Sequence, residues 1–507
     1  MSTINSAVTA ANSSANSQLQ QAAQSIISGS TGNSSMDVNS LVTALVNAKT
    51  AGQAAALSAQ QSSDNTQISA YGALSAALSA LQASLTTLSN GSLQNTFTAT
   101  ASGTGVTATA GAGAVAGSYS LGVTQIATSQ SLSSAAFGSS TALGTGTMTL
   151  SLGSQSFTVN VNSTNNTLSG IAAAINNTTG NPGIVASVVN GSDGAHLVLS
   201  STPTGAANTI SVALSNVSGD NGLSSLGVTS TASTTGGQST FTSANSGAAW
   251  KQSTAAQDAA FTINGIAGTS ASNTVTSAIT GVTLNLTSAA VNASQTQTLT
   301  VAADTKSQAA AINNFATLYN TLVTTMGSLS SFTSGASSQG PLLGDSTLNT
   351  INNALASIVA SGVNGSGANG SGATVNLASI GVTLQADGTL QVNNTTLNSA
   401  LQSNPSGVAT LFNSTNGIGQ QLTTNITNYT QANGLIAART NALTNDLKSV
   451  TQQQSNLSDY VAQLTTQYQA QFTALNTLMA TMNSNSQYLT QLFGGANSAG
   501  AMSNNKS

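Results

Sequence analysis

Few residues in this 507-residue chain could support acid–base or metal chemistry. The chain has one histidine, no cysteine and no glutamate, and all ten of its acidic residues are aspartate. Without cysteine there is no disulfide, no thiolate nucleophile and no thiolate-bound zinc or iron–sulfur site. General acid–base catalysis needs a titratable group held beside a substrate. We therefore expect no catalytic, cofactor-binding or metal-binding residues, and we predict that the protein is not an enzyme.

Asp193 and His196 form the only pair of an acid and an imidazole within reach of each other in the sequence. As a functional pair they could act as a base or bind a metal. However, they flank Gly194 in the stretch Asn-Gly-Ser-Asp-Gly, and aspartate is favoured in turns because its side chain hydrogen-bonds the local backbone. We predict a hairpin turn, with His196 opening the next strand.

A glycine-rich stretch superficially resembles a nucleotide-binding loop. Its glycines are Gly103, Gly105, Gly111, Gly113 and Gly117. A phosphate loop needs a preceding strand, a following helix and usually a lysine. Here β-like sequence follows and no lysine is near, so we predict a flexible link between domains. Asp304 and Lys306 stand at the start of a predicted helix, where the aspartate complements the helix dipole.

The scarcity of charge excludes further classes of function. Six Lys and Arg residues are scattered over the whole chain, too few for a surface that neutralises several phosphates, so no nucleic acid is expected. No apolar run approaches the roughly 20 residues of a membrane span, and the N-terminal sequence lacks the basic and apolar regions of a cleaved signal. A cysteine-free, charge-poor chain suits export in an unfolded state.

Both ends of the chain carry the periodicity of helices. Residues 1–40 are polar and low in complexity, so we expect a segment that is disordered in isolation. Asp37 can cap a short helix that ends near Val46, and a longer helix follows and ends at Asn90. The seam of the longer helix takes coiled-coil steps of three and four residues from Tyr71 onward, and its members are Leu57, Ile68, Tyr71, Leu74, Leu78, Leu81, Leu85 and Leu88.

A longer seam runs through the C-terminal region in one such register. Its apolar members are Leu443, Leu447, Val450, Leu457, Val461, Leu464, Tyr468, Leu475, Leu478, Met482, Leu489 and Leu492. Gln454, Gln471 and Asn485 interrupt it, and polar seam residues can fix register or partner number. Residues 307–330 and 346–359 carry two shorter seams. Four such segments, split between the two ends, predict one helical bundle.

The lengths of these helices predict an overhang. At about 1.5 Å per residue, a helix over 57–89 is about 50 Å long and one over 440–493 about 80 Å. The uncovered part needs a partner, which residues 1–50 of the same chain or another subunit could supply. The predicted contact residues are Leu41, Leu45, Leu464, Tyr468, Leu475, Met482, Leu489 and Leu492.

The middle of the chain alternates with period two, which predicts strands. Residues 148–200 indicate a hairpin, a short helix over 166–176 and a second hairpin. Residues 259–288 resemble the first part of this unit, which suggests two copies of one module. Segments 229–248 and 360–373 are predicted linkers.

Several segments together resemble one known family. MDVNSLVTALVNAK (36–49) resembles the opening motif of the flagellar hook-associated protein 2, or filament cap, family. IGVTLQADGTLQVNNTTLNSALQSNPSGVATLF (380–412) is similar to the most recognisable part of that family's C-terminal region. Residues 71–88, 117–134 and 148–200 resemble its first long helix, its entry strand and a module of flagellin-related outer domains. Lys49, Thr50 and Gly52 stand where the family usually carries an acid and then a proline.

The resemblance implies an α+β multidomain protein, with a terminal helical bundle and two inserted β-rich domains. It implies a helical leg domain over 41–95 plus 305–493 with a small hairpin at 380–392. It also implies disordered terminal segments at 1–40 and 494–507, the first of which orders only on assembly. An inner β-rich domain is expected over 96–142 plus 238–304, and an outer one over 143–237.

The resemblance also implies a function. The protein would cap the tip of the bacterial flagellar filament as a homo-oligomeric ring and promote flagellin folding and polymerisation beneath it. It would leave the cell through the flagellar export apparatus without a cleaved signal peptide and act extracellularly at the filament tip. The implied partners are flagellin, the hook–filament junction protein and a dedicated export chaperone, and the eight seam residues would contact flagellin or neighbouring subunits.

Three other functions compete with the cap. A surface-displayed adhesin could bind host glycans or mucin through the outer β domains, and deletion of 143–237 would distinguish it, because filaments would persist while attachment is lost. A hydrolase would need a convergent pair of acids, which the sequence lacks. A hook–filament junction protein or a flagellin is disfavoured by the 380–412 segment.

Overall fold

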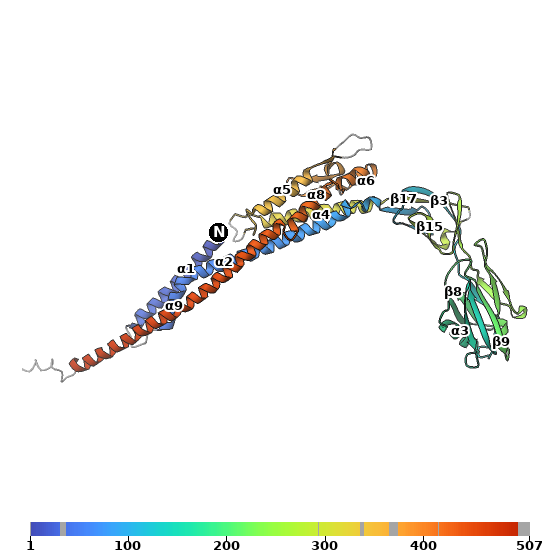
Figure 1. Ribbon diagram of the computed structural model, residues 1–507, viewed down its shortest axis with the longest axis horizontal. Coiled ribbons are helices and arrows are strands. Elements are labelled where there is room, and N and C mark those ends of the chain that lie inside the picture. The colour runs from blue at the N-terminus through green and yellow to red at the C-terminus, as the bar shows by residue number, and fades with distance from the viewer. Residues whose placement is uncertain are drawn as a thin grey trace, which may run out of the picture. The chain divides into compact units, whose positions relative to one another are not determined.

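The structure is a computed structural model that describes residues 2–30, 37–292, 294–334, 339–364, 374–413 and 415–494. The chain divides into two compact units, Met1–Asn90 with Ala309–Ser507, and Gly91–Gln308. The first unit is mainly helical and the second is mainly β-strand (Figure 1). This is the predicted fold class: helices from both ends of the chain, with β structure between them.

The first unit is built on two long antiparallel helices. Val42 and Val46 of α2 pack with Leu464 of α9, whereas Leu57 of α2 packs with the earlier α9 residues Val450 and Leu457. The helices of the unit are α1 (Ser2–Ser30), α2 (Val38–Ser89), most of α4 (Thr305–Leu329), α5 (Ser346–Ala360), α6 (Asn394–Ser403), α7 (Pro405–Phe412), α8 (Ile418–Thr430) and α9 (Leu435–Gly494). Helices from the two ends of the chain therefore pack in one bundle, as predicted.

The N-terminal region differs from the prediction in two ways. Residues 1–40 were expected to be disordered, but Ser2–Ser30 form helix α1, which packs along α2. Ala15 is buried, and the side chain of Asn12 lies against Gly52. The second difference is that α2 is one continuous helix of 52 residues, not a short helix and a longer one. Asp37 caps it as predicted, since its carboxylate accepts a hydrogen bond from the Ser40 N–H at 3.1 Å, and no proline interrupts it.

By length and composition α2 is long and apolar enough to cross a membrane. Its fully buried seam residues, from Leu74 to Leu85, instead pack inside the bundle beside α8 and α9. This is the environment of a core helix, so we keep the prediction that the protein does not insert into a membrane.

A partly exposed ion pair lies between α5 and α9, near Tyr71 of α2. The Asp345 carboxylate caps α5 by accepting a hydrogen bond from the Leu348 N–H at 2.9 Å, and its other oxygen lies 3.7 Å from Nε of Arg439 on α9. Burial, followed by the neighbouring Asp345 carboxylate, raises the pKa of Tyr71 on α2 to about 12. The ion pair links the start of α5 to α9.

The shorter seams and the 380–412 segment fold nearly as predicted. In α5 the last seam residue buried is Val359 and not Ile358, because a straight helix repeats every 3.6 residues and not every 3.5. Asp387 and Gly388 turn the hairpin of β20 (Val382–Leu384) and β21 (Leu390–Val392). Asn404 caps α7, and Pro405 occupies its first turn. A further pair, β18 (Val363–Asn364) with β19 (Thr374–Val375), borders 365–373, so most of the predicted linker at 360–373 lies outside the described residues.

The second unit contains one core between a five-stranded and a three-stranded sheet. The strand orders are β1-β17-β3-β13-β14 and β15-β16-β2. Leu121, Phe261, Leu284 and Leu299 are buried between them. The strands are β1 (Phe97–Ala101), β2 (Val106–Ala110), β3 (Gly117–Gln125), β13 (Ala259–Ile263), β14 (Ile266–Ser270), β15 (Thr274–Ile279), β16 (Val282–Leu286) and β17 (Gln297–Ala303). We call this the inner core.

A further core of the same unit lies between two more sheets and α3 (Leu168–Asn177). The strand orders are β11-β10-β9-β5-β6 and β12-β4-β8-β7. Met148, Leu150, Ile171 and Trp250 are buried there. The strands are β4 (Ser131–Ser133), β5 (Thr145–Leu152), β6 (Gln155–Val161), β7 (Ile184–Gly191), β8 (Gly194–Ser201), β9 (Ile210–Ser218), β10 (Val228–Thr231), β11 (Thr240–Ser243) and β12 (Lys251–Thr254). We call this the outer core.

Strand β7 lies at the free edge of its sheet, and two side-chain amides pair with that edge. Asn176 accepts from the Ala186 N–H at 2.9 Å and donates to the Ala186 carbonyl at 2.7 Å. Asn181 makes the same pair of bonds with Ile184, at 2.8 and 2.7 Å. Edge strands offer unpaired backbone groups to other chains, and here two of the positions are occupied internally.

The strand pairing moves the predicted domain boundaries. Strands β4 and β12 were assigned to the inner domain, but β4 pairs with β8 and β12 pairs with β4. Leu132 of β4 and Trp250, which precedes β12, are buried in the outer core, and this burial assigns both strands to that core. The outer core therefore takes in residues 131–142 and 238–254 as well as 143–237.

Three local predictions for the second unit are wrong. The hairpin–helix–hairpin over 148–200 forms, but the proposed second copy over 259–288 has strand β15 where the helix was expected, and β15 pairs with β16. The predicted linker 229–248 contains most of β10 and all of β11. The glycine-rich stretch is no domain link: it supplies turns between β1, β2 and β3. Gly105 has φ +83°, and a Cβ there would lie 2.1 Å from the Ala290 nitrogen.

Candidate assembly interface

The acid–imidazole pair is part of the turn between β7 and β8. Nε2 of His196 lies 3.0 Å from Oδ1 of Asp193, and its Nδ1 lies 2.7 Å from the Ser134 carbonyl oxygen. The hydrogen bond with Asp193, followed by that with the Ser134 carbonyl, raises the pKa of His196; the same pairing lowers the pKa of Asp193. Two acceptors around one ring favour the imidazolium. The geometry is that of a structural ion pair within a turn, as predicted.

Asp304 also has a structural role, at the start of a helix. Its Oδ1 accepts a hydrogen bond from the Ser307 N–H at 2.9 Å at the start of α4. Among the described residues, no group of three or more His or Asp side chains could hold a metal ion. The remaining candidate for a functional site is a surface that could bind another protein.

Helix α9 buries only the first part of its seam. Leu443, Val450, Leu457 and Leu464 are spaced by seven residues and all are buried. Gln454, a polar seam residue, donates to Oε1 of Gln61 on α2 at 3.2 Å. This polar pair lies among apolar neighbours and helps to define the register of α2 against α9.

The buried part of the seam ends near a cation–aromatic contact. Nζ of Lys49 on α2 lies 5.7 Å from the ring centre of Tyr460 on α9, within the usual range for a cation–π interaction. The Tyr460 hydroxyl, followed by Tyr468, raises the pKa of Lys49. Lys49 therefore keeps its charge while it binds the neighbouring helix.

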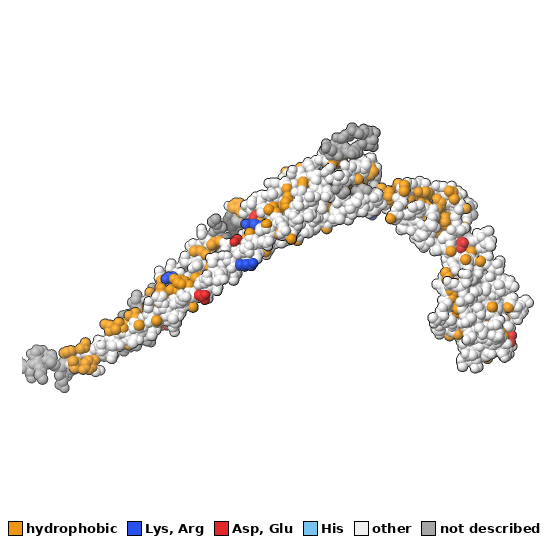
Figure 2. Space-filling view, viewed as in Figure 1, with side chains coloured by type: hydrophobic (Ala, Val, Ile, Leu, Met, Phe, Trp, Pro, Cys, Tyr) orange, Lys and Arg blue, Asp and Glu red, His pale blue; other side chains and the backbone are white. Residues whose placement is uncertain are grey.

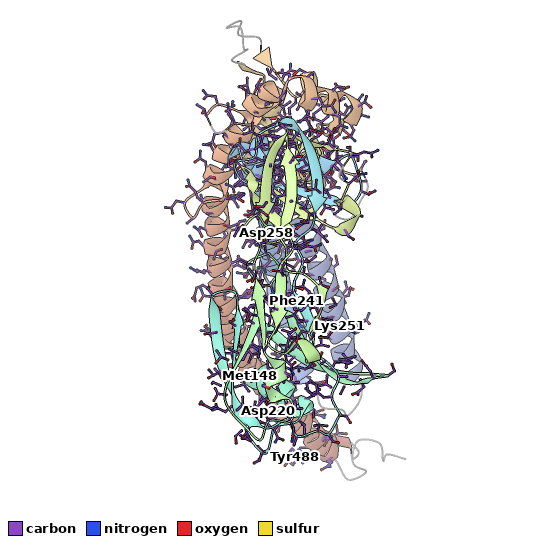
Figure 3. The ribbon with its side chains drawn as sticks, turned by 90° about the vertical axis from the view of Figure 1, so that its right-hand side faces the viewer. Met148, Asp220, Phe241, Lys251, Asp258 and Tyr488 are labelled. Carbon is purple, nitrogen blue, oxygen red and sulfur yellow. The ribbon has the colours of Figure 1, made fainter. Side chains whose placement is uncertain are left out.

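Beyond Phe472, the large apolar side chains of α9 are not covered by any part of the chain that the structure describes. The large apolar side chains there are 43 % (Leu475) to 64 % (Tyr488 and Phe493) exposed. Hydrophobic side chains gather along this end of the helix, and Tyr488 marks it (Figures 2 and 3). The exposed residues are Leu475, Leu478, Met479, Met482, Tyr488, Leu489, Leu492 and Phe493. We call this set the α9 overhang.

The structure separates the eight predicted contact residues into two groups. Leu41 and Leu464 are buried within the first unit, and Leu45 and Tyr468 are partly buried there. These four were expected to be available to a partner and are not, because α1, α2 and α9 cover one another. The other four belong to the α9 overhang: Leu475, Met482, Leu489 and Leu492.

Sequence reasoning missed Met479, Tyr488 and Phe493, which lie outside the two seam columns. The sequence does carry a pattern that points to two of them, Met479 and Phe493. One residue after each member of the seam column that starts at Leu443, the buried part of α9 carries only hydroxyl side chains: Thr444, Thr451, Ser458 and Thr465. The same column then continues with Phe472, Met479, Ser486 and Phe493. The apolar stripe is therefore wider where the helix is uncovered.

The α9 overhang is apolar and uncharged. No Lys, Arg or Asp occurs from 460 to 494. A partner would be held by burial of leucine, methionine and aromatic side chains, at about 25 cal/mol per Å² of apolar surface. A stripe wider than two heptad columns suits contact with more than one helix.

Three family models match the chain. The C-terminal model of flagellar hook-associated protein 2 matches residues 256–484, and its N-terminal model matches residues 34–130. The flagellin hook IN motif matches residues 147–203, which contain the hairpin–helix–hairpin of the outer core.

Individual relatives agree with these models. Flagellar hook-associated protein 2 of Escherichia coli O157:H7 is 37 % identical over 252 residues, which are 48 % of this chain and 52 % of that protein. Its counterpart in Salmonella typhimurium is 30 % identical over 249 residues, 47 % and 51 % of the two chains. The matched stretch thus spans about half the length of these curated relatives. The crystal structure of the flagellar cap protein FliD D1-D2-D3 domains from Escherichia coli is similar with a TM-score of 0.55 and 32 % identity, and covers 74 % of this chain and 99 % of that one.

Proposed function

The chain belongs to the flagellar hook-associated protein 2 family, and we propose that it caps the tip of the bacterial flagellar filament and promotes flagellin folding and polymerisation beneath it. The proposal gives it a structural role and no enzymatic one. The single observation that carries the proposal beyond family membership is the α9 overhang, an uncharged apolar helix end that no other described part of the chain covers.

The α9 overhang supplies a contact surface for assembly. We propose that Leu475, Met482, Leu489 and Leu492 contact neighbouring subunits of a homo-oligomeric ring or flagellin. Each half-exposed leucine or methionine can contribute on the order of 1 kcal/mol when covered, and association entropy offsets part of the sum. Such contacts are individually weak, which suits a cap that shifts as subunits are added.

The remaining partners and the location follow from the same role. The protein would be exported through the flagellar export apparatus, act extracellularly at the filament tip, and meet the hook–filament junction protein there. A dedicated export chaperone is a further proposed partner, since the uncovered apolar stripe needs cover before assembly.

Complementation of a strain that lacks the protein tests the proposal. The test chain carries Leu475→Ser, Met482→Ser and Leu489→Ser, which remove one apolar column without touching the bundle core. The control carries Asn483→Ser, Gln487→Ser and Gln491→Ser on the other side of the same stretch, where all three side chains are exposed. We expect the control to restore filaments. The test chain should be secreted but fail to restore them, with flagellin released into the medium.

Full restoration of filaments by the test chain would overturn the role given to the α9 overhang. A chain without the outer core separates the cap from the adhesin. Thr128 and Gln257 form a β-bridge, so their backbones are adjacent and a short linker can replace the residues between them. Normal filaments combined with lost attachment to host glycans or mucin would favour the adhesin, whereas loss of filaments would favour the cap.

A further inference from the structure

The fold is held together with very few titratable groups. Among the described residues the structure shows two ion pairs, Asp193 with His196 and Asp345 with Arg439, and charged side chains are few on the face that Figure 2 draws. An average chain of this length has about 125 charged side chains, whereas this one has 16. The contacts that carboxylates and cations make in other proteins are therefore made here by other groups.

Asparagine side chains make several of these contacts, in both units. In the second unit, Oδ1 of Asn273 accepts from the Ala127 N–H at 2.7 Å while its Nδ2 donates to the Ala127 carbonyl at 2.8 Å. In the first unit, Asn320 on α4 makes the same pair of bonds with Leu390 on β21, at 2.6 and 2.8 Å. The two asparagines at the edge of β7 bind in the same way. An amide is not among the side chains that gain or lose a proton in water, so these bonds do not depend on pH.

A glutamine at the centre of a buried network adds to them. Gln130 is fully buried, and its Oε1 accepts from the Ile210 N–H at 2.6 Å. Its Nε2 donates to Oγ of Ser230 at 3.0 Å and to Oε1 of Gln252 at 2.8 Å. All of these groups are uncharged in acid and in neutral solution alike. The network that joins strands of the outer core therefore keeps its hydrogen bonds when the pH falls.

Several carboxylates that accept hydrogen bonds lie in caps and turns. Hydrogen bonds from nearby Ser or Thr hydroxyls, followed by those from backbone N–H groups, lower the pKa values of Asp37, Asp220, Asp304 and Asp387. A carboxylate with a lowered folded pKa contributes stability that is lost as pH falls through that pKa. These four side chains are at least partly exposed, and a protonated carboxyl keeps acceptor capacity, so acid removes only part of each contribution.

Acid also leaves this chain with little positive charge. When every aspartate is protonated, the six Lys and Arg residues and the one histidine give seven charges, against about 60 in an average chain of this length. They are Lys49, Arg439, Lys448 and Lys506 in the first unit and His196, Lys251 and Lys306 in the second. The aspartates that face one of them are Asp193, near His196 and Lys251, Asp304, near Lys306, and Asp345, near Arg439. Repulsion between like charges destabilises compact proteins in acid, and here it is weak.

We propose that the protein is built to stay folded in strongly acidic surroundings, because amides and hydroxyls that do not titrate join its strands and helices. This inference does not depend on the proposed cap function.

Urea titration of the full chain at pH 7 and at pH 2.5, well below the ordinary aspartate pKa of about 3.9, tests the proposal. Trp250 is the only tryptophan of the chain and is buried in the outer core, so its fluorescence reports on that core, while circular dichroism at 222 nm reports on the helical unit. We expect cooperative transitions at both pH values, with midpoints within about 1 M urea of each other. A chain that shows no cooperative transition at pH 2.5, as an acid-induced molten globule does, would overturn the proposal.

Asn181→Asp tests the cause, because it exchanges an amide for a carboxyl group of the same shape. Nδ2 of Asn181 donates to the carbonyls of Ile184 at 2.7 Å and Ile175 at 3.1 Å, and an ionised carboxylate would repel both. The fluorescence midpoint should therefore fall by about 1 M or more at pH 7, and by less than half as much at pH 2.5, where a proton restores one donor.

Gln155→Glu is the matched control, since it makes the same chemical change at a side chain that is exposed at the start of β6, and its midpoint should stay within about 0.25 M of the unaltered chain at either pH. If Asn181→Asp does not fold at pH 7, it is refolded from urea at pH 2.5, and a transition found only there supports the proposal. Should it fold at neither pH, Asn320→Asp is judged in the same way by circular dichroism. Equal losses at the two pH values would overturn the proposal.

Discussion

Two leucines of α9 allow a direct test of where the helix is covered. Leu464 and Leu492 lie 28 residues apart, which is four heptads, so they occupy the same column of one helix. Leu464 is 5 % exposed and Leu492 is 51 % exposed. Substitution of either by alanine removes the same atoms. Because alanine is at least as good a helix former as leucine, helix propensity does not obscure the comparison.

The expected magnitudes follow from the surroundings of each leucine. Leu464 packs with Val42 and Val46, and with partly exposed neighbours that can move into the space left behind. Leucine-to-alanine changes in cores cost about 2–5 kcal/mol, and less where the site can collapse. We therefore expect Leu464→Ala to lower the free energy of unfolding of the helical unit by about 2–3 kcal/mol. Leu492→Ala should change it by no more than about 0.5 kcal/mol.

Urea unfolding followed by circular dichroism at 222 nm measures both effects, since the first unit contributes most of the helix. With a slope of about 2 kcal/mol per M, the midpoint should fall by about 1 M for Leu464→Ala and stay within about 0.25 M for Leu492→Ala. Sedimentation at low concentration should confirm that both variants are compared as monomers. Equal losses in the two variants would refute the reasoning, because Leu492 would then have to be covered within a single chain.

Three other predictions concern single side chains. The pKa of His196 is raised in the folded protein, so its pairing with Asp193 contributes stability that is fully present below the unfolded pKa of about 6.5 and is lost as pH rises through the folded pKa. The urea midpoint of Trp250 fluorescence should therefore be lower at pH 8.5 than at pH 6. His196→Gln should abolish this difference. Phe315 is fully buried in the bundle, so Phe315→Ala should lower the free energy of unfolding by about 3–5 kcal/mol, measured by circular dichroism; a loss under about 1 kcal/mol would contradict the packing. Asn176→Ala should leave the edge of β7 unpaired and cause concentration-dependent association in light scattering, whereas Asn177→Ala, one residue further on, should not.

The fold class could be predicted from the sequence because hydrophobic spacing changes from 3.5 at the ends to 2 in the middle. Asp37, Asp387 and Asn404 could also be assigned, since caps and tight turns depend on a few neighbouring residues. Helix α1 could not. Its small apolar residues, such as Ala15, carry too weak a pattern by themselves, and only the surface of α2 makes their burial favourable.

Only part of the contact surface could be predicted from the sequence, for a related reason. Periodicity identifies a seam but does not say which partner covers it, so Leu41 and Leu464 looked the same as Leu489. Only three-dimensional packing distinguishes them. The assignment of β4 and β12 to the wrong side of a boundary has the same origin, because strand partners far apart in sequence leave no local signal.

The continuity of α9 has a consequence for how its free end meets a partner. Starting a helix in water is unfavourable because several residues must be fixed before the first backbone hydrogen bond forms, while adding residues to an existing helix is nearly neutral. Since Leu443 to Leu464 are held against α2, the helix is already nucleated when it emerges from the bundle. A partner that bound there would therefore meet a preformed helix, and ordering of the last turns by propagation would cost little when the contact formed.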